Sequence, residues 1–204
     1  MAKKRPIIAV VTRDLRFAKR VIDEARRRGI DAKHFNNLEE VSLSAHAIIA
    51  KKGEIDNTTD ERVVLLNQDM TPTAIIDKAI EVGLCKRNVR KAVVVIDPGK
   101  KTGVAFFADE ILLRSETYYQ NDVLSQDLAD FFKNHVDCKK CIYVGEGAPQ
   151  FREQLISHLT SRIPKITPDM IKILPEKNSS RLAGGKDEIA ATVISRMRRS
   201  RKVL

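Results

Sequence analysis

The sequence predicts an α/β protein whose secondary structure falls into two units, each built around its own sheet. Short apolar runs rich in Val and Ile alternate with segments whose apolar residues recur at three- and four-residue steps. The polar, basic stretch 85–90 separates two regions with different patterns. Beyond it, three consecutive strands are joined closely enough to form an antiparallel meander. We therefore expect a small α/β domain over residues 1–85 and a mixed five-stranded sheet with flanking helices over residues 91–204.

The first unit is expected to alternate strands and helices. Strands are predicted at 7–11, 45–50 and 62–66, and helices at 14–28 and 71–81. The apolar stripe of the first helix consists of Leu15, Ala18, Ile22 and Ala25. Its opposite face carries Arg13, Arg16, Arg20 and Arg27, either as a basic contact surface or simply as the solvated side of the helix. Strands that alternate with helices indicate a small parallel, Rossmann-like sheet.

The second unit is expected to begin with the meander and to continue with alternating helices and strands. Strands are predicted at 91–96, 103–108, 111–117, 141–144 and 170–174, and helices at 123–135, 151–161 and 187–199. The short Ala108-Asp109-Glu110 connection predicts a hairpin turn. In the first of these helices the inward residues are expected to be Leu124, Leu128, Phe131 and Phe132.

The formal net charge of +10 is distributed unevenly along the chain. Residues 1–30, 86–101 and 161–204 are net basic, whereas the intervening segments are net acidic. This distribution favours a polyanionic partner, most often a nucleic acid backbone, although a basic protein can also carry lysines merely for solubility. With no Trp and 5% aromatic residues, base stacking is not expected to be the main mode of binding.

Composition also excludes several classes of protein. No apolar run approaches the 18 residues of a membrane span, so no membrane association is expected. Three cysteines are too few for a disulfide framework, which favours a reducing, cytoplasmic location.

Three acidic residues stand at strand ends or at the start of a helix, positions where functional sites are often found in proteins with a central sheet. Asp97 ends the most apolar strand, Glu146 ends the strand after the meander, and Asp187 opens the last helix at the edge of its apolar stripe. Each has an ordinary explanation, as a turn residue, a loop acid or a helix-start acid. Gathered at one end of a sheet, however, the carboxylates would repel one another unless a cation neutralised them. Oxygen ligands of this kind suit Mg²⁺ or Mn²⁺.

The segment Ile96-Asp97-Pro98-Gly99-Lys100-Lys101-Thr102-Gly103-Val104-Ala105 resembles the first-strand signature of the RuvC-type Holliday junction resolvases. This family belongs to the RNase H-like superfamily, whose element order matches the one predicted over about 91–204. Glu146, in Tyr-Val-Gly-Glu, matches the acid that ends the family's fourth strand. Asp187, followed by Ile189-Ala190-Ala191, matches the acid of its C-terminal helix.

The resemblance implies metal-dependent hydrolysis of phosphodiester bonds in a DNA junction or an RNA. Two Mg²⁺ or Mn²⁺ ions about 4 Å apart would act together, with Asp97 bridging them and Glu146 and Asp187 each holding one. The family places a fourth carboxylate where this chain has Gly184, and Glu188, which points to solvent, is the nearby candidate for that ligand. Resolvases of this type are dimers, so a homodimer is a further expectation.

Six basic residues are expected to contact the nucleic acid. They are Lys100 and Lys101 beside Asp97, Arg181 and Lys186 in the loop 175–186, and Arg196 and Arg199 in the last helix. Two other classes of function remain open from the sequence. One is a nucleic-acid-binding protein that has the RNase H-like fold without cleavage, which Gly184 motivates. The other is an actin-like phosphotransferase or ATPase, which requires two such domains where this chain has one.

Overall fold

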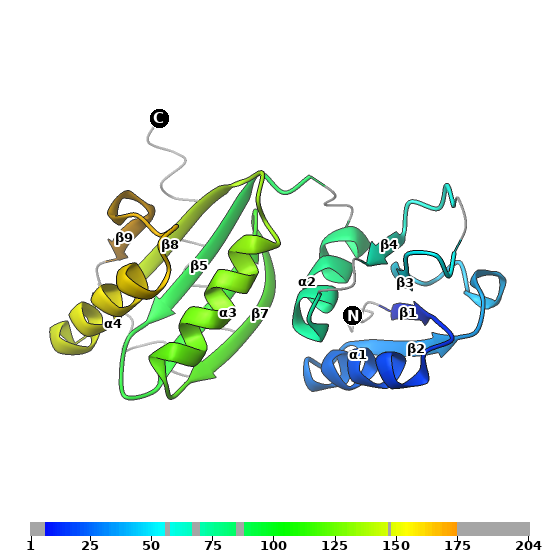
Figure 1. Ribbon diagram of the computed structural model, residues 1–204, viewed down its shortest axis with the longest axis horizontal. Coiled ribbons are helices and arrows are strands. Elements are labelled where there is room, and N and C mark those ends of the chain that lie inside the picture. Colours follow the sequence, from blue (N-terminus) through cyan, green and yellow to red (C-terminus); the bar gives the residue numbers. More distant parts are fainter. Residues whose placement is uncertain (1–6, 56–57, 67–69, 85–87, 147, 175–204) are drawn as a thin grey trace, which may run out of the picture. The chain divides into compact units, whose positions relative to one another are not determined.

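The computed structural model describes residues 7–55, 58–66, 70–84, 88–146 and 148–174 (Figure 1). These residues divide into two compact units between Asn88 and Val89. The predicted helix 187–199 and the basic loop 175–186 lie outside the described residues. Within the described ranges, no helix has the length and apolar character needed to cross a membrane.

The first unit contains a four-stranded sheet in the order β2-β1-β3-β4, and every neighbouring pair in it is parallel. Its strands are β1 (Ile7–Val11), β2 (Asp31–Phe35), β3 (Ala47–Lys51) and β4 (Val63–Leu66). The expectation of a parallel sheet is confirmed. Strand β2 was not predicted, because its sequence Asp-Ala-Lys-His-Phe has no apolar run. It forms an edge of the sheet, where polar side chains remain in water.

Helices α1 (Leu15–Arg27) and α2 (Pro72–Gly83) pack against one face of this sheet. Their apolar side chains join those of Ile8, Val10 and Ile49 in one buried cluster. The opposite face, with Ala9 and Ile48, is covered by the β2–β3 connection, which includes the short helix η1 (Leu38–Glu40). Among the described residues, α1 and α2 therefore lie on one face of this sheet, and the other face is covered by a connection that contains only the short helix η1.

Helix α1 is rotated about its axis relative to the prediction. Asp14 caps it, accepting a hydrogen bond from Phe17 N, and Gly29 follows with φ +70°. The residues that it buries are Phe17, Ala18, Val21 and Ala25. The prediction that Leu15 faces the core is wrong. Leu15 is 66% exposed, because Phe17 and Val21 occupy the positions that meet the sheet.

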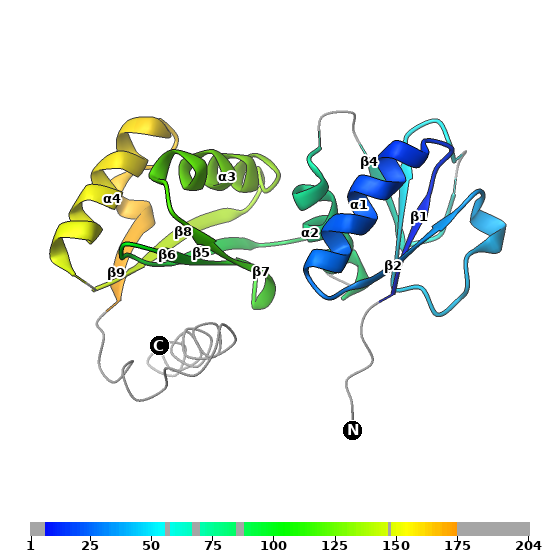
Figure 2. The ribbon, with the colours of Figure 1, turned by 90° about the horizontal axis from the view of Figure 1, so that it is seen from below.

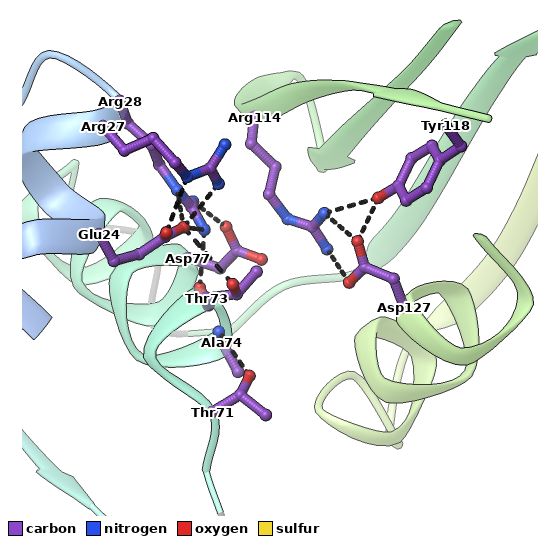
Figure 3. A network of polar contacts seen from close by, with 10 residues as sticks. All are labelled: Glu24, Arg27, Arg28, Thr71, Thr73, Ala74, Asp77, Arg114, Tyr118 and Asp127. Atoms are coloured by element: carbon purple, nitrogen blue, oxygen red, sulfur yellow. Dashed lines mark hydrogen bonds and ion pairs between the residues drawn. The ribbon is translucent and has the colours of Figure 1, made fainter. Parts of the chain in front are cut away.

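A buried ion network joins α1 to α2 (Figure 3). The Arg28 side chain, only 6% exposed, donates to Glu24 Oε1 at 2.7 Å and to Asp77 Oδ1 at 2.5 Å. It also donates to the Thr73 carbonyl at 3.0 Å. Although burial raises the pKa of Glu24, hydrogen bonds and positive charge from Arg27 and Arg28 outweigh it, and the pKa is lowered. The network fixes one helix against the other.

The second unit contains a five-stranded mixed sheet in the order β7-β6-β5-β8-β9. Its strands are β5 (Lys91–Asp97), β6 (Thr102–Ala108), β7 (Ile111–Tyr118), β8 (Lys139–Gly145) and β9 (Ile171–Leu174). β5, β6 and β7 form the expected antiparallel meander, whereas β8 and β9 run parallel to β5. The mixed five-stranded sheet is thus confirmed.

Helices α3 (Asn121–Lys133) and α4 (Pro149–Arg162) lie on one face of this sheet (Figure 2). A short helix, η2 (Pro168–Met170), precedes β9. The four inward positions predicted for α3 are all buried, and the Phe131 ring packs edge-on against Phe106 of β6 at 5.1 Å between centroids. The other face carries a separate apolar cluster around Val93, Val95 and Phe107.

The turn between β6 and β7 anchors the beginning of β5. Asp109 has φ +54°, a left-handed conformation that Asp adopts more readily than most residues. Its Oδ1 accepts hydrogen bonds from Arg90 N and Lys91 N, both at 3.0 Å. The Asp109 amide donates to the Lys91 carbonyl at 2.7 Å. These bonds fix the alignment of β5 with the hairpin.

Candidate functional site

Asp97 and Glu146 lie at the same edge of the second sheet. Asp97 is the last residue of β5, and Glu146 directly follows Gly145 at the end of the adjacent parallel strand β8. Both residues are exposed. The carboxyl ends of neighbouring parallel strands meet at one edge, which is where open α/β sheets place their ligands. The structure therefore brings two of the three predicted acids to adjacent strand ends.

Asp97 stands between two glycines. On one side, Asp97 pairs with Gly103 of β6. On the other side, Ile96 pairs with Val144 of β8, so the next residues along the two strands, Asp97 and Gly145, are neighbours. A Cβ atom on residue 145 would lie 3.6 Å from Asp97 Oδ1, and one on residue 103 would lie 3.9 Å from Asp97 Cβ. No side chain thus flanks the carboxylate on either neighbouring strand.

Asp97 lies on the sheet face that is opposite α3 and α4. Because side chains alternate along a strand, it shares a face with Val93 and Val95, whereas Ile96 shares one with Val94. Val94 pairs with Phe106, which packs against α3. Helices α3 and α4 therefore lie on the other side of the sheet from Asp97.

The turn after Asp97 presents two lysines. Pro98 is buried, and the hydroxyl of Thr102, which is 6% exposed, donates to the Gly99 carbonyl at 3.4 Å. Lys100 and Lys101 between them are exposed, as expected of residues that would meet phosphates.

Glu146 is positioned by contacts on both sides of its backbone. Its amide donates to the Leu174 carbonyl of β9 at 2.9 Å. Its carbonyl accepts from Arg152 Nη1 at 2.6 Å, which joins it to α4. The segment between β8 and α4 is short, since α4 begins at Pro149. The backbone of Glu146 is therefore held by both α4 and β9.

A buried polar network supports the same edge from beneath α3 (Figure 3). Arg114 of β7, with its side chain 2% exposed, donates to both carboxylate oxygens of Asp127 on α3, at 2.7 and 2.9 Å. The Tyr118 hydroxyl donates to the same carboxylate. Burial and the adjacent Asp127 charge raise the pKa of Tyr118 far above its ordinary value. The end of β7 is therefore fixed to α3.

The donor chemistry at this edge fits a hard divalent cation. Two carboxylates supply oxygen ligands, and the bare glycine beside Asp97 Oδ1 leaves space for an ion or its bound water. Within the ranges that the structure describes, no three His, Cys, Asp or Glu side chains gather into a metal-binding group. The third predicted ligand, Asp187, and the further candidate, Glu188, lie outside those ranges.

Four of the predicted nucleic-acid contacts, Arg181, Lys186, Arg196 and Arg199, also lie outside the described residues. The structure adds two residues that the sequence did not single out. Gly145 places no side chain beside the Asp97 carboxylate. Tyr119, immediately after β7, is 71% exposed, and the Lys101 ammonium lies 5.5 Å from the centre of its ring. Two consecutive tyrosines at the end of a predicted strand are the feature of the sequence that could have drawn attention to Tyr119.

The carboxyl edge of the first sheet is occupied by the chain's own residues. The Asp14 carboxylate that caps α1 accepts a hydrogen bond from Lys51 Nζ of β3 at 2.7 Å. The hydrogen bonds from Lys51 and from Phe17 N lower the pKa of Asp14. Its negative charge at the helix N-terminus takes the place that an anionic ligand would use.

No known protein family, curated protein or solved structure matches this chain.

Proposed function

We propose that the second unit is a metal-dependent nuclease of the RNase H-like, RuvC-like type, which hydrolyses phosphodiester bonds in structured nucleic acid. One observation carries the proposal. Asp97, within the Asp-Pro-Gly-Lys-Lys-Thr-Gly segment, and Glu146 lie at adjacent carboxyl ends of the two parallel strands at the centre of the sheet. Numbered within the unit, the strand order is 3-2-1-4-5, and the two acids follow strands 1 and 4. This is the arrangement that the resemblance implies.

The residues have distinct roles in this proposal. Asp97, which has glycines beside it on both neighbouring strands, would be a central ligand of the cations. Glu146 and Asp187 would each hold one of them, with Glu188 as a further candidate. When bound, two Mg²⁺ or Mn²⁺ ions supply activation of water and stabilisation of the leaving oxygen. The Leu174 carbonyl and Arg152 Nη1 hold the backbone of Glu146, from which one of these carboxylates extends.

Lys100 and Lys101 provide the positive charge that meets the substrate. Both are exposed on the turn that directly follows Asp97, so a phosphate contacted there lies near the carboxylates. The basic segments 1–30 and 161–204 add attraction for a polyanion along the chain. The substrate is accordingly proposed to be a DNA junction or a structured RNA.

The test uses the purified full chain with Mg²⁺ or Mn²⁺. Labelled four-way junctions, flaps, RNA–DNA hybrids and single strands are incubated with the wild type, with Asp97→Asn and with Asp137→Asn. Asp137 is an exposed acid before β8, at the opposite edge of the sheet, and serves as the matched control. We expect at least one substrate to be cut, Asp97→Asn to abolish cleavage, and Asp137→Asn to cut like the wild type.

Two other outcomes are decisive. Cleavage that is undiminished in Asp97→Asn refutes the site. Tight binding of a substrate without cleavage, together with no Mn²⁺ binding to the wild type, establishes a non-catalytic nucleic-acid-binding protein instead.

A further inference from the structure

Tyr119 is the only exposed aromatic residue among the residues that the structure describes, and these include every Phe and Tyr of the chain. The residue is 71% exposed. Single exposed apolar residues are common on protein surfaces, so exposure alone indicates no partner. The position of Tyr119 and its contact with Lys101 are what point to a ligand.

Tyr119 lies at the same edge of the sheet as Asp97. The ladder between β6 and β7 ends at the pair Thr102–Tyr118, and the next residues outward are Lys101 and Tyr119. Asp97 pairs with Gly103, which in turn pairs with Thr117, two residues before Tyr119. With about 4.8 Å between strands and about 3.3 Å per residue, the Cα atoms of Asp97 and Tyr119 lie about 12 Å apart. That separation is within a few nucleotides of a phosphate bound at Asp97.

The residue before Tyr119 is held in place. Tyr118, the last residue of β7, is 8% exposed and hydrogen-bonded to Asp127 of α3. Tyr119 directly follows it, outside the strand. Since Tyr118 is fixed by a buried network, the backbone that carries the Tyr119 ring is held in place. A rigid aromatic surface loses little conformational freedom on binding.

Lys101 adds positive charge to this ring. Its ammonium lies 5.5 Å from the ring centre, close enough for a cation–π contact. The ring nevertheless keeps most of its surface open, so a planar base can stack on it while the ammonium remains near the phosphate of the same nucleotide. Aromatic rings paired with basic side chains in this way are how proteins hold unpaired nucleotides. A base inside a duplex has no face free for such a contact.

We propose that Tyr119 and Lys101 bind one unpaired nucleotide, with its base stacked on Tyr119 and its phosphate beside Lys101. The substrate would then contain a single-stranded segment close to the bond at Asp97. This inference rests on the proposed function. It goes beyond it by specifying which part of the nucleic acid is unpaired and which residues recognise it.

The experiment measures binding in the full-length Asp97→Asn variant, so that cleavage does not interfere. The probes are a blunt duplex and the same duplex with a single-stranded overhang that carries 2-aminopurine, whose fluorescence is quenched by stacking. We expect quenching on the overhang and about tenfold tighter binding of the overhang probe. Adding Tyr119→Ala should abolish both effects and leave the affinity for the blunt duplex unchanged. Tyr119→Phe, which keeps the ring, should preserve both.

Lys101 is tested with a matched lysine. Lys101→Ala should weaken binding of the overhang probe and reduce the slope of log affinity against log salt by about one, as expected for one lost phosphate contact. Lys139→Ala removes the same charge at the opposite edge of the sheet and should change neither quantity. Absence of quenching, or equal loss of affinity for both probes in Tyr119→Ala, overturns the inference while the nuclease proposal stands. Absence of binding to either probe at low salt overturns both.

Discussion

Gly145 keeps a side chain away from the Asp97 carboxylate. A Cβ atom at residue 145 would lie 3.6 Å from Asp97 Oδ1 and also 3.6 Å from the Ile96 carbonyl oxygen and from Pro98 Cδ. These are ordinary contact distances, so one methyl group fits. A branched side chain would extend further into the space beside the carboxylate.

Replacing Gly145 with Val should therefore weaken metal binding without unfolding the sheet. Val is favourable in a strand, but its two methyl groups would crowd Asp97. We expect Gly145→Val to weaken Mn²⁺ binding by about tenfold or more, measured by titration calorimetry. Gly145→Ala should bind Mn²⁺ nearly as the wild type does, and circular dichroism should show the same fold in both variants. Unchanged Mn²⁺ affinity in Gly145→Val would place the cation elsewhere.

Removing the Asp127 carboxylate should destabilise the second unit strongly. Arg114, with its side chain 2% exposed, would lose both hydrogen bonds to this carboxylate while remaining buried. We expect Asp127→Ala to lower the unfolding free energy by about 3 kcal/mol. Tyr118→Phe removes only the hydroxyl and should cost about 1–2 kcal/mol. Hydrogen exchange of peptides from β7 and α3, followed in urea, measures the unfolding free energy of this unit alone. Equal losses of unfolding free energy in the two variants would contradict the expectation.

In the first unit, a buried and an exposed aspartate should differ in how much they contribute to stability. Asp77→Ala removes a buried partner of Arg28 and should cost about 3 kcal/mol of unfolding free energy. Asp23 instead pairs with Lys19 on the exposed side of the helix, with side chains 48% and 77% exposed. Asp23→Ala should therefore change stability by about 0.5 kcal/mol or less. Urea unfolding followed by hydrogen exchange of α1 and α2 peptides measures both, and similar losses would show that the Arg28 network contributes little.

Glu24 makes the stability of this network depend on pH. Because its pKa is lowered in the folded protein, the stabilisation is fully present above the ordinary glutamate pKa of about 4.3 and is lost as the pH falls through the folded value. Glu24→Gln should therefore be less stable than the wild type at neutral pH, and the difference should shrink as the solution is acidified. A difference that stays constant between about pH 3 and pH 6 would contradict this expectation.

Strands could be predicted from the sequence where their residues are apolar without interruption. β5, with Ala-Val-Val-Val-Ile, is unmistakable because it is buried on both faces. β2 was missed because an edge strand needs only backbone pairing with β1, and its polar side chains carry no pattern. The rotation of α1 was also beyond prediction, since two overlapping apolar stripes are available and docking to the sheet selects the one with Phe17.

The candidate site could be predicted in part. Asp97 and Glu146 were placed at one edge because strand ends are visible in the sequence. The glycines that flank Asp97 could not be assigned to it, because cross-strand neighbours depend on the pairing register. Buried charges were missed for a similar reason. Asp77 and Glu81 are 4% and 1% exposed, and the sequence does not single out either of them. Lys78 lies three residues before Glu81 on the same helix, but the pairing of Asp77 with Arg28 depends on the fold.

The Asp109 turn contributes to the pairing register that sets which face of the sheet carries Asp97. Its hydrogen bonds to Arg90 N and Lys91 N align β5 from the end opposite the site. A slip of one residue would exchange the two faces, turning Asp97 under the helices and Ile96 outward. The pairing register at the Asp109 turn therefore continues along the seven residues of β5 to the turn after Asp97. A transplant of the Asp97 loop into another sheet would therefore need a strand that is paired in the same register, because the register and not the loop sets the face on which Asp97 lies.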